Sequence, residues 1–210
     1  MSGSLSVLTG DALACEVVRQ LDTTDWQKGL TSPQVQVYFS RALPAPVVGY
    51  RTVTEHHARP EELFAFLGTH MLGAFSQLNK RFVFAEQLVA EPQVVRTGFS
   101  MPPGFSSREF LHLLVCTRLD ERTWVVAYGP VGDESPYPAA REGFIRCPMY
   151  PSGQRISTID NGRTRVEHLM VYELGGWISH RLQNSVFHAG HLRAYHDEWL
   201  GLVQRFGITP

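Results

Sequence analysis

The chain has 210 residues, of which 43% are hydrophobic and 19% are charged, and its formal net charge is −1. This length suits one domain with its own core, and this composition excludes a disordered chain. The near-zero charge argues against a nucleic-acid-binding protein, because such proteins carry a surplus of basic residues. No apolar run approaches the roughly 20 residues that cross a bilayer.

The cysteines and the N-terminus indicate a reducing compartment. Cys15, Cys116 and Cys147 are scattered and include no CxxC pair, which is typical of reduced thiols. Small residues precede Cys15, but Asp11 interrupts them and no basic segment comes first, so we do not expect a signal peptide. We therefore expect a single cytoplasmic domain over residues 1–210.

The first third of the chain predicts a helix, two strands and a second helix. Apolar residues at helical spacing follow Asp11, and a helix is expected over residues 10–29, ending at Gly29. Residues 34–40 and 47–55 alternate with period two, which predicts two strands. Residues 60–71 predict a short helix, because a proline and two glutamates suit its first turn. Another short helical turn is expected over residues 72–80.

Residues 81–174 change to runs rich in β-branched and aromatic residues. Turn signals separate seven such runs, which favours short strands joined into an antiparallel meander. The runs are residues 81–90, 92–101, 108–120, 122–131, 141–150, 153–160 and 164–174. With the two earlier strands, the sequence predicts a sheet of about nine strands.

The chain closes with a long amphipathic helix over residues 180–206. Its apolar residues recur at steps of three and four, namely Leu182, Val186, Ala189, Leu192, Tyr195, Trp199, Leu202 and Phe206. The expected fold is therefore α+β, with a curved antiparallel sheet wrapped around this helix and a core over residues 34–206. A gap between sheet and helix is a natural cavity for an apolar ligand.

Several segments resemble START lipid-transfer domains, a family with the helix-grip fold in the wider START/SRPBCC superfamily. The resemblance covers roughly residues 30–206 and depends on the order and spacing of its motifs. These are VQVYFSR (35–41), VVGYRTVTEHHARPEELFAFL (47–67), SREFL (107–111), EGFIRC (142–147) and YELGGWISHRLQNSV (172–186).

The resemblance implies a cavity for one lipid or sterol-like molecule, carried between membranes without catalysis. It also implies that a loop and the C-terminal helix gate this cavity. Sterol-binding members carry an acid–arginine pair inside. Here the arginine position corresponds to Leu114, and residues 92–107 contain no acid.

If Leu114 points inward, the period of two places His112 and Cys116 on the same face of their strand. The same argument places His168, Met170 and Tyr172 on the inner face of the last strand. We expect His112 and His168 to hydrogen-bond the polar group of the ligand. The alternative is that each is a partly buried histidine satisfied by the backbone or by water.

The remaining expected ligand contacts come from a central strand and from the start of the last helix. They are Trp124, Val126, Tyr128, Leu182, Val186, Phe187 and Gly190. Trp124 and Met170 fit ordinary core packing as well as a cavity. Gly175 and Gly176 allow the chain to turn before Trp177, which we expect to pack against the sheet and shape the pocket without contacting the ligand.

Two long loops are candidates for the mouth of the cavity, residues 100–107 and 131–140. Met101 and Phe105 in the first are the expected gate residues, which would touch a membrane surface while the ligand exchanges. The alternative is a rigid turn without a membrane role. The expected partners are thus a hydrophobic small molecule and, transiently, a membrane, with no nucleic acid and a monomeric state.

Other functions remain open at this point. Polyketide cyclases and aromatases use related cavities, and the histidines and tyrosines offer proton donors and bases for such an enzyme. Cys116 lies near His112 on one face, a weak indication of a nucleophile. His188, His191 and His196 raise metal binding, but the sequence places no closed set of ligands. We expect no enzyme, cofactor or metal.

Overall fold

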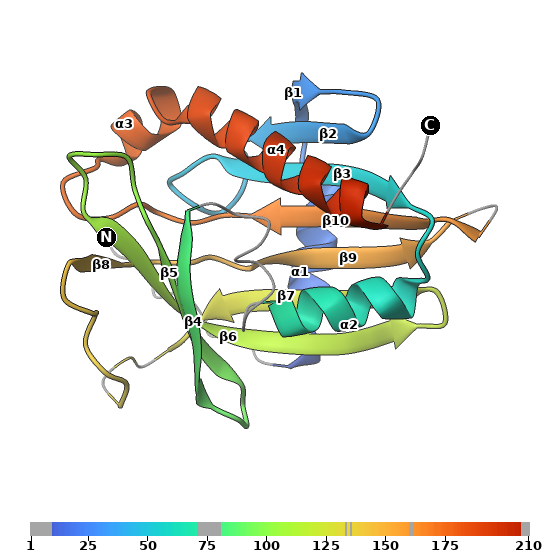
Figure 1. The fold of residues 1–210 in the computed structure, drawn as a ribbon, viewed down its shortest axis with the longest axis horizontal. Coiled ribbons are helices and arrows are strands. Elements are labelled where there is room, and N and C mark those ends of the chain that lie inside the picture. The colour runs from blue at the N-terminus through green and yellow to red at the C-terminus, as the bar shows by residue number, and fades with distance from the viewer. Residues whose placement is uncertain (1–9, 71–80, 133, 135, 160–161, 207–210) are drawn as a thin grey trace.

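The computed structural model describes residues 10–70, 81–132, 134, 136–159 and 162–206. It is an α+β fold in which a ten-stranded curved sheet carries helices on both faces (Figure 1). The helices are α1 (Asp11–Thr23), α2 (Pro60–His70), α3 (His180–Ser185) and α4 (His188–Phe206). The strands are β1 (Gln27–Thr31), β2 (Val35–Ser40), β3 (Gly49–His56), β4 (Phe82–Val89), β5 (Val94–Phe99), β6 (Ser107–Asp120), β7 (Thr123–Pro130), β8 (Phe144–Cys147), β9 (Ser152–Thr158) and β10 (Thr164–Met170). Among the described helices, none is both long and apolar enough to cross a membrane.

The sheet departs from a simple meander in two places. Its strand order is β1-β2-β3-β10-β9-β7-β6-β5-β4, so β3 pairs with the distant β10. Strand β8 lies off this path and pairs with β6 in parallel, with Ser107 opposite Phe144. The seven runs expected over residues 81–174 are all strands. The expected antiparallel sheet is confirmed, and the parallel pairing of β8 with β6 is an exception that arises because β8 approaches β6 from the long connection after β7.

The strand that was not expected is β1, and most of it lies in a segment that was predicted to belong to the first helix. Helix α1 ends at Thr23, and the Trp26 indole donates a hydrogen bond to the Leu21 carbonyl. Gly29 therefore lies within β1 and ends no helix. A Cβ at Gly29 would stand 2.8 Å from Leu192 Cδ2 of α4, so the missing side chain allows α4 to approach this edge.

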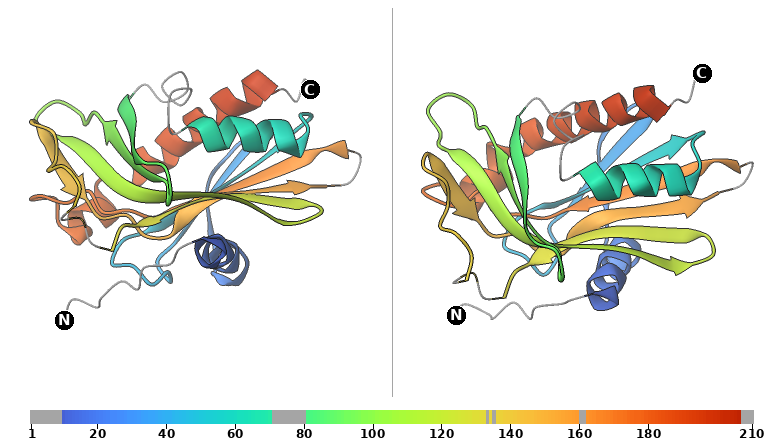
Figure 2. Two further views of the ribbon diagram at one scale, coloured as in Figure 1. Left: turned by 90° about the horizontal axis from the view of Figure 1, so that it is seen from below. Right: turned by 60° about the horizontal axis from the view of Figure 1, so that its bottom comes forward.

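The two faces of the sheet have different covers. Helix α1 lies on one face, whereas α2 and α4 lie on the other (Figure 2). The apolar side of α1 packs on outward-facing residues of the central strands, among them Leu111, Leu113, Val125 and Leu169. This outer layer leaves the opposite, inner face to α2 and α4, and that face carries the candidate site.

The closing helix is broken. Ser179 caps α3 by accepting a hydrogen bond from the Leu182 amide, and α3 ends at Ser185 before α4 begins at His188. Because the two helices are not continuous, the expected apolar stripe fails at its start: Val186 and Ala189 are exposed. The later part is confirmed, because Tyr195, Trp199 and Leu202 are buried against the sheet. The helical turn expected over residues 72–80 lies outside the described residues.

Candidate functional site

The inner face of the sheet is an apolar wall covered by α2 and α4. Four predicted site residues belong to it and are almost fully buried, namely Leu114, Trp124, Val126 and Tyr128. Met170 and Tyr172 pack against the same cluster and are half-buried. The strand alternation inferred from the sequence therefore places these side chains on the face that was expected.

A row of polar side chains crosses this wall. We define the polar track as His112, Tyr128, Gln154 and His168, which come from the adjacent strands β6, β7, β9 and β10. All four are buried. The Tyr128 hydroxyl donates to Gln154 Oε1 at 2.5 Å, His168 is the register partner of Gln154, and the His112 and Tyr128 rings lie 5.7 Å apart.

The two histidines of the polar track differ in their hydrogen bonding. Trp199 of α4 donates its indole N–H to His168 Nδ1 at 3.1 Å, so the imidazole proton must lie on Nε2. That Nε2 has no partner among the described residues, and neither ring nitrogen of His112 has one. Burial lowers the pKa of each histidine to about 3, so both rings are neutral near pH 7.

A second histidine cluster connects the start of α4 to the sheet. The Tyr50 hydroxyl lies 3.0 Å from His188 Nδ1 and 3.3 Å from His191 Nδ1, and the Tyr172 hydroxyl lies 3.4 Å from His191 Nε2. Burial, with smaller effects of Arg81 and His188, lowers the pKa of His191 to about 4. Metal binding was the alternative for His188 and His191, but their described contacts are with tyrosine hydroxyls and aromatic rings.

Glu198 is a site candidate that sequence reasoning missed. It lies in α4, one residue before the buried Trp199, and burial raises the pKa of its carboxyl to about 8. Its charge also contributes to the raised pKa values of Tyr128, Tyr172 and Tyr195. In the sequence, Glu198 was marked only by its position beside the apolar stripe of the last helix, where a glutamate is normally solvated.

At the end of the sheet next to α3, aromatic rings face outward. We define the aromatic mouth as Phe105, Trp177, Val186 and Phe187. The rings of Phe105 and Trp177 stack with centroids 5.1 Å apart, and Phe187 meets Phe105 edge-on at 5.5 Å. Trp177 and Val186 are each 66% exposed. The expectation that Trp177 packs against the sheet is therefore wrong: its partner is the 100–107 loop.

Other predicted residues fall outside the inner wall. Gly190 is exposed, and nothing lies within 4 Å of a Cβ built on it. Cys116 Sγ lies beside Gly68 of α2, 3.1 Å from where a Cβ would be, yet Cys116 keeps an exposed surface. Burial nevertheless raises the pKa of this thiol to about 11, which makes it a poor nucleophile at neutral pH. Met101 and Leu182 are half-buried.

Arg108 connects the two segments that carry the mouth. Its guanidinium donates to the Ser106 carbonyl, directly after Phe105, and to the Leu174 carbonyl, directly before the glycine pair. The side chain is buried, and this burial lowers its pKa. In the sequence analysis, Arg108 appeared only as part of the SREFL motif. A linear pattern does not reveal which carbonyl groups its guanidinium contacts.

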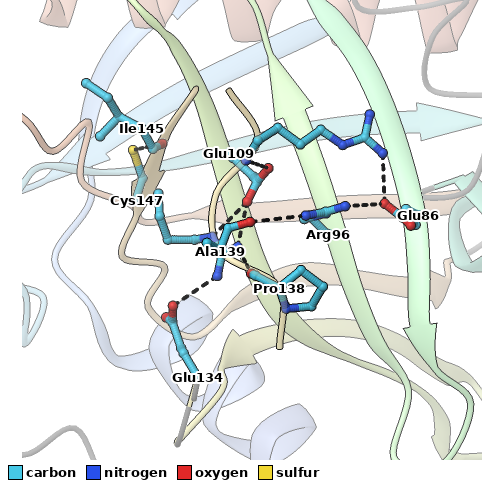
Figure 3. Close-up of polar contacts among 10 residues, drawn as sticks. Glu86, Arg96, Glu109, Glu134, Pro138, Ala139, Ile145 and Cys147 are labelled. Atoms are coloured by element: carbon cyan, nitrogen blue, oxygen red, sulfur yellow. Dashed lines mark hydrogen bonds and ion pairs between the residues drawn. The ribbon is translucent and has the colours of Figure 1, made fainter. Parts of the chain in front are cut away.

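On the other side of this end, charged groups hold the chain after β7. We define the ion clasp as Glu86, Arg96, Glu109, Glu134, Arg141 and Arg146. Arg146 lies at its centre: its Nη2 is 2.6 Å from Glu109 Oε1, its Nη1 is 3.1 Å from Glu134 Oε2, and it donates to the Pro138 carbonyl (Figure 3). The Glu109 side chain is fully buried.

The second part of the ion clasp lies over β4 and β5. Glu86 accepts hydrogen bonds from Arg96 at 2.6 Å and from Arg141 at 2.8 Å, and Arg96 donates to the Ala139 carbonyl (Figure 3). The Arg141 guanidinium lies 3.7 Å above the Phe84 ring. Both arginines lower the pKa of Glu86. Glu134 and residues 136–146 are thus held by ion pairs, whereas no described residue forms an ion pair with the 100–107 loop.

Comparison with known families identifies the family of this chain. The sequence model described as "START domain" matches residues 93–208, more than half of the chain. The chain belongs to the START domain family. No curated protein matches it significantly. The match begins just before β5 and includes the polar track, the ion clasp except for Glu86, and both helices at the mouth.

Solved START structures share the fold at low sequence identity. Human StAR-related lipid transfer protein 5 has a TM-score of 0.73 and 19% identity, covering 93% of this chain and 95% of its own. The human StarD13 lipid transfer and protein localization domain has a TM-score of 0.68 and 16% identity, with 96% and 98% covered. A STAR-related lipid transfer protein fragment from Xanthomonas axonopodis has a TM-score of 0.64 and 19% identity, with 84% and 98% covered. These matches confirm the helix-grip fold expected from the sequence.

Proposed function

We propose that this START domain binds one lipid or sterol-like hydrophobic molecule between the inner wall and α4, and carries it between membranes without catalysis. The observation that supports the proposal is the aromatic mouth, which lies at one end of an apolar wall in a family of lipid-binding domains. The names of the three matched structures described above all include lipid transfer. Burial of the ligand's apolar surface would supply affinity at roughly 25 cal/mol per Å².

The exposed rings support a transient membrane contact as part of this function. Trp177 is half of a stacked pair, so its outward position has a defined partner in Phe105. Large amphipathic rings suit the boundary between water and lipid. The gate thus comprises the expected Phe105 and the unexpected Trp177, on two segments that Arg108 connects at their base. We further propose that the protein acts as a cytoplasmic monomer.

An enzyme of the polyketide cyclase or aromatase kind is the second candidate. The observation that favours it is Glu198, a half-buried residue of α4 whose carboxyl pKa is raised to about 8 by desolvation, which suits proton transfer near neutral pH. His112 and His168, with pKa values of about 3, are poor bases by the same argument. We place lipid binding first because the family and the mouth support it together.

Native mass spectrometry of the purified protein, with extraction and identification of bound molecules, tests the proposal directly. One bound lipid per chain, and movement of that lipid between donor and acceptor vesicles, are the expected results. Absence of binding from mixed vesicles would overturn the proposal. Conversion of an added polyketide-like substrate, lost in Glu198→Gln, would favour the enzyme.

A further inference from the structure

His112 is buried and has two unsatisfied nitrogens. Its side chain has no exposed surface, and neither Nδ1 nor Nε2 has a hydrogen-bond partner among the described residues. Buried polar groups in folded proteins are nearly always paired, because an unpaired group has lost its water without a replacement. Of the described residues with unpaired buried nitrogens, only His112 is a histidine with both ring nitrogens unpaired.

The neighbours of His112 determine which chemical group it can accept. Burial alone accounts for its lowered pKa, so the ring is neutral and has one N–H donor and one acceptor nitrogen. Tyr128 stands edge-on to it, with its hydroxyl proton already given to Gln154, so that oxygen can accept but not donate. A group that both donates and accepts hydrogen bonds fits this corner, and a hydroxyl is the simplest such group.

A chain of ring contacts runs from the aromatic mouth through Phe187, His191 and Tyr172 to Phe110, two residues from His112 on the same face of β6. Phe110, the next inward residue along β6, lies 5.2 Å from the Tyr172 ring, and Tyr172 keeps part of its surface exposed. His168 lies against Trp199 of α4, whose indole N–H occupies its Nδ1. A ligand that enters beside the aromatic mouth therefore passes Tyr172 and Phe110 before it meets the unpaired ring.

We propose that His112 and the Tyr128 hydroxyl recognise an uncharged hydroxyl group of the ligand, so that this domain selects neutral lipids over lipids with charged headgroups. The inference depends on the proposed function, because it names the ligand class of the same site. A neutral imidazole among apolar side chains offers no counter-charge to a phosphate, carboxylate or ammonium group.

The test offers the full-length chain vesicles that contain cholesterol, diacylglycerol, phosphatidylcholine and phosphatidylserine in equal amounts. Bound lipids are then identified by native mass spectrometry. We expect the wild type to be enriched in one of the two uncharged lipids. His112→Phe should lower the affinity for that lipid about tenfold, the effect of one lost hydrogen bond, and His112→Gln should retain most of it.

His56→Phe is the matched control. His56 is also buried and has an unpaired Nδ1, but its Nε2 bonds Thr54 at the far end of β3, so its replacement should leave lipid selection unchanged. Unchanged affinity in a folded His112→Phe variant would overturn the inference and leave lipid binding intact. Enrichment of phosphatidylserine would overturn it too, pointing to the unpaired Nη2 of Arg108. If no lipid binds, the proposed function itself fails.

Discussion

The end of the sheet next to α3 has two sides, and the chain is held in a different way on each of them. The ion clasp fixes Glu134 and residues 136–146 with short ion pairs, and its Glu109 is fully buried. The 100–107 loop and the segment before α3 are joined at their base by Arg108, which donates to carbonyls of both, and beyond this base by ring stacking, with Trp177 and Val186 largely exposed. Short ion pairs with a buried carboxylate hold the chain in one conformation, whereas stacked rings that are exposed to water can separate with a small loss of free energy. If the proposed site opens at this end, the comparison predicts that it opens on the aromatic side.

The strongest way to break this comparison is to remove Glu109. Glu109→Ala leaves the Arg146 guanidinium without its buried counter-charge, and also leaves the Arg141 backbone amide without its acceptor. We expect the free energy of unfolding to fall by about 3 kcal/mol, measured by urea denaturation.

Glu134→Ala is the matched control, because Glu134 pairs with the same arginine but its side chain is half-exposed. Its loss should lower the free energy of unfolding by less than about 1 kcal/mol. Equal effects of the two variants would contradict the view that burial makes the clasp rigid.

Lowering the pH should weaken the mouth side before the clasp side. Burial lowers the pKa of His191 to about 4, below the ordinary value near 6.5. Its contribution to stability is therefore complete above pH 6.5 and is lost as the pH falls toward 4, about 2 kcal/mol by pH 5. His191 connects α4 to Tyr50 and Tyr172, so hydrogen exchange at pH 5 should accelerate in α3 and early α4 relative to residues 136–147.

Variants separate titration from the loss of hydrogen bonds. His191→Phe should remove about 2 kcal/mol of the decrease in unfolding free energy between pH 7 and pH 5. Tyr172→Phe deletes one hydroxyl partner but leaves the imidazole, so it should retain the full pH dependence. The same pH dependence in His191→Phe as in the wild type would show that the other buried histidines, His56, His112 and His168, account for it.

The strand pattern was predictable because period two places alternate residues on opposite faces, which located His112, Leu114, Tyr128 and His168 on the inner wall. Strand β1 was not predictable, because residues 27–31 include Gly29, whose role depends on contact with Leu192 of the distant helix α4. Helical spacing also suggested one continuous closing helix, although the break before His188 turns Val186 outward. The partners of Arg108, Glu109 and Trp177 are set by tertiary contacts that no local pattern encodes.

The smallest effect on stability is expected at the mouth itself. Trp177→Ala removes a ring that is 66% exposed and stacks only on one side, so the free energy of unfolding should change by less than about 1 kcal/mol. If the ring contacts the membrane during exchange, the lipid transfer rate between vesicles should nevertheless fall roughly tenfold, equivalent to about 1.4 kcal/mol of lost interaction. Leu30→Ala is the control, because Leu30 is an exposed apolar residue of β1 at the opposite edge of the sheet from β4. A parallel loss of transfer in both variants would mean that general surface hydrophobicity, and not the stacked pair, controls exchange. Unaltered transfer in Trp177→Ala would move the entrance away from the aromatic side.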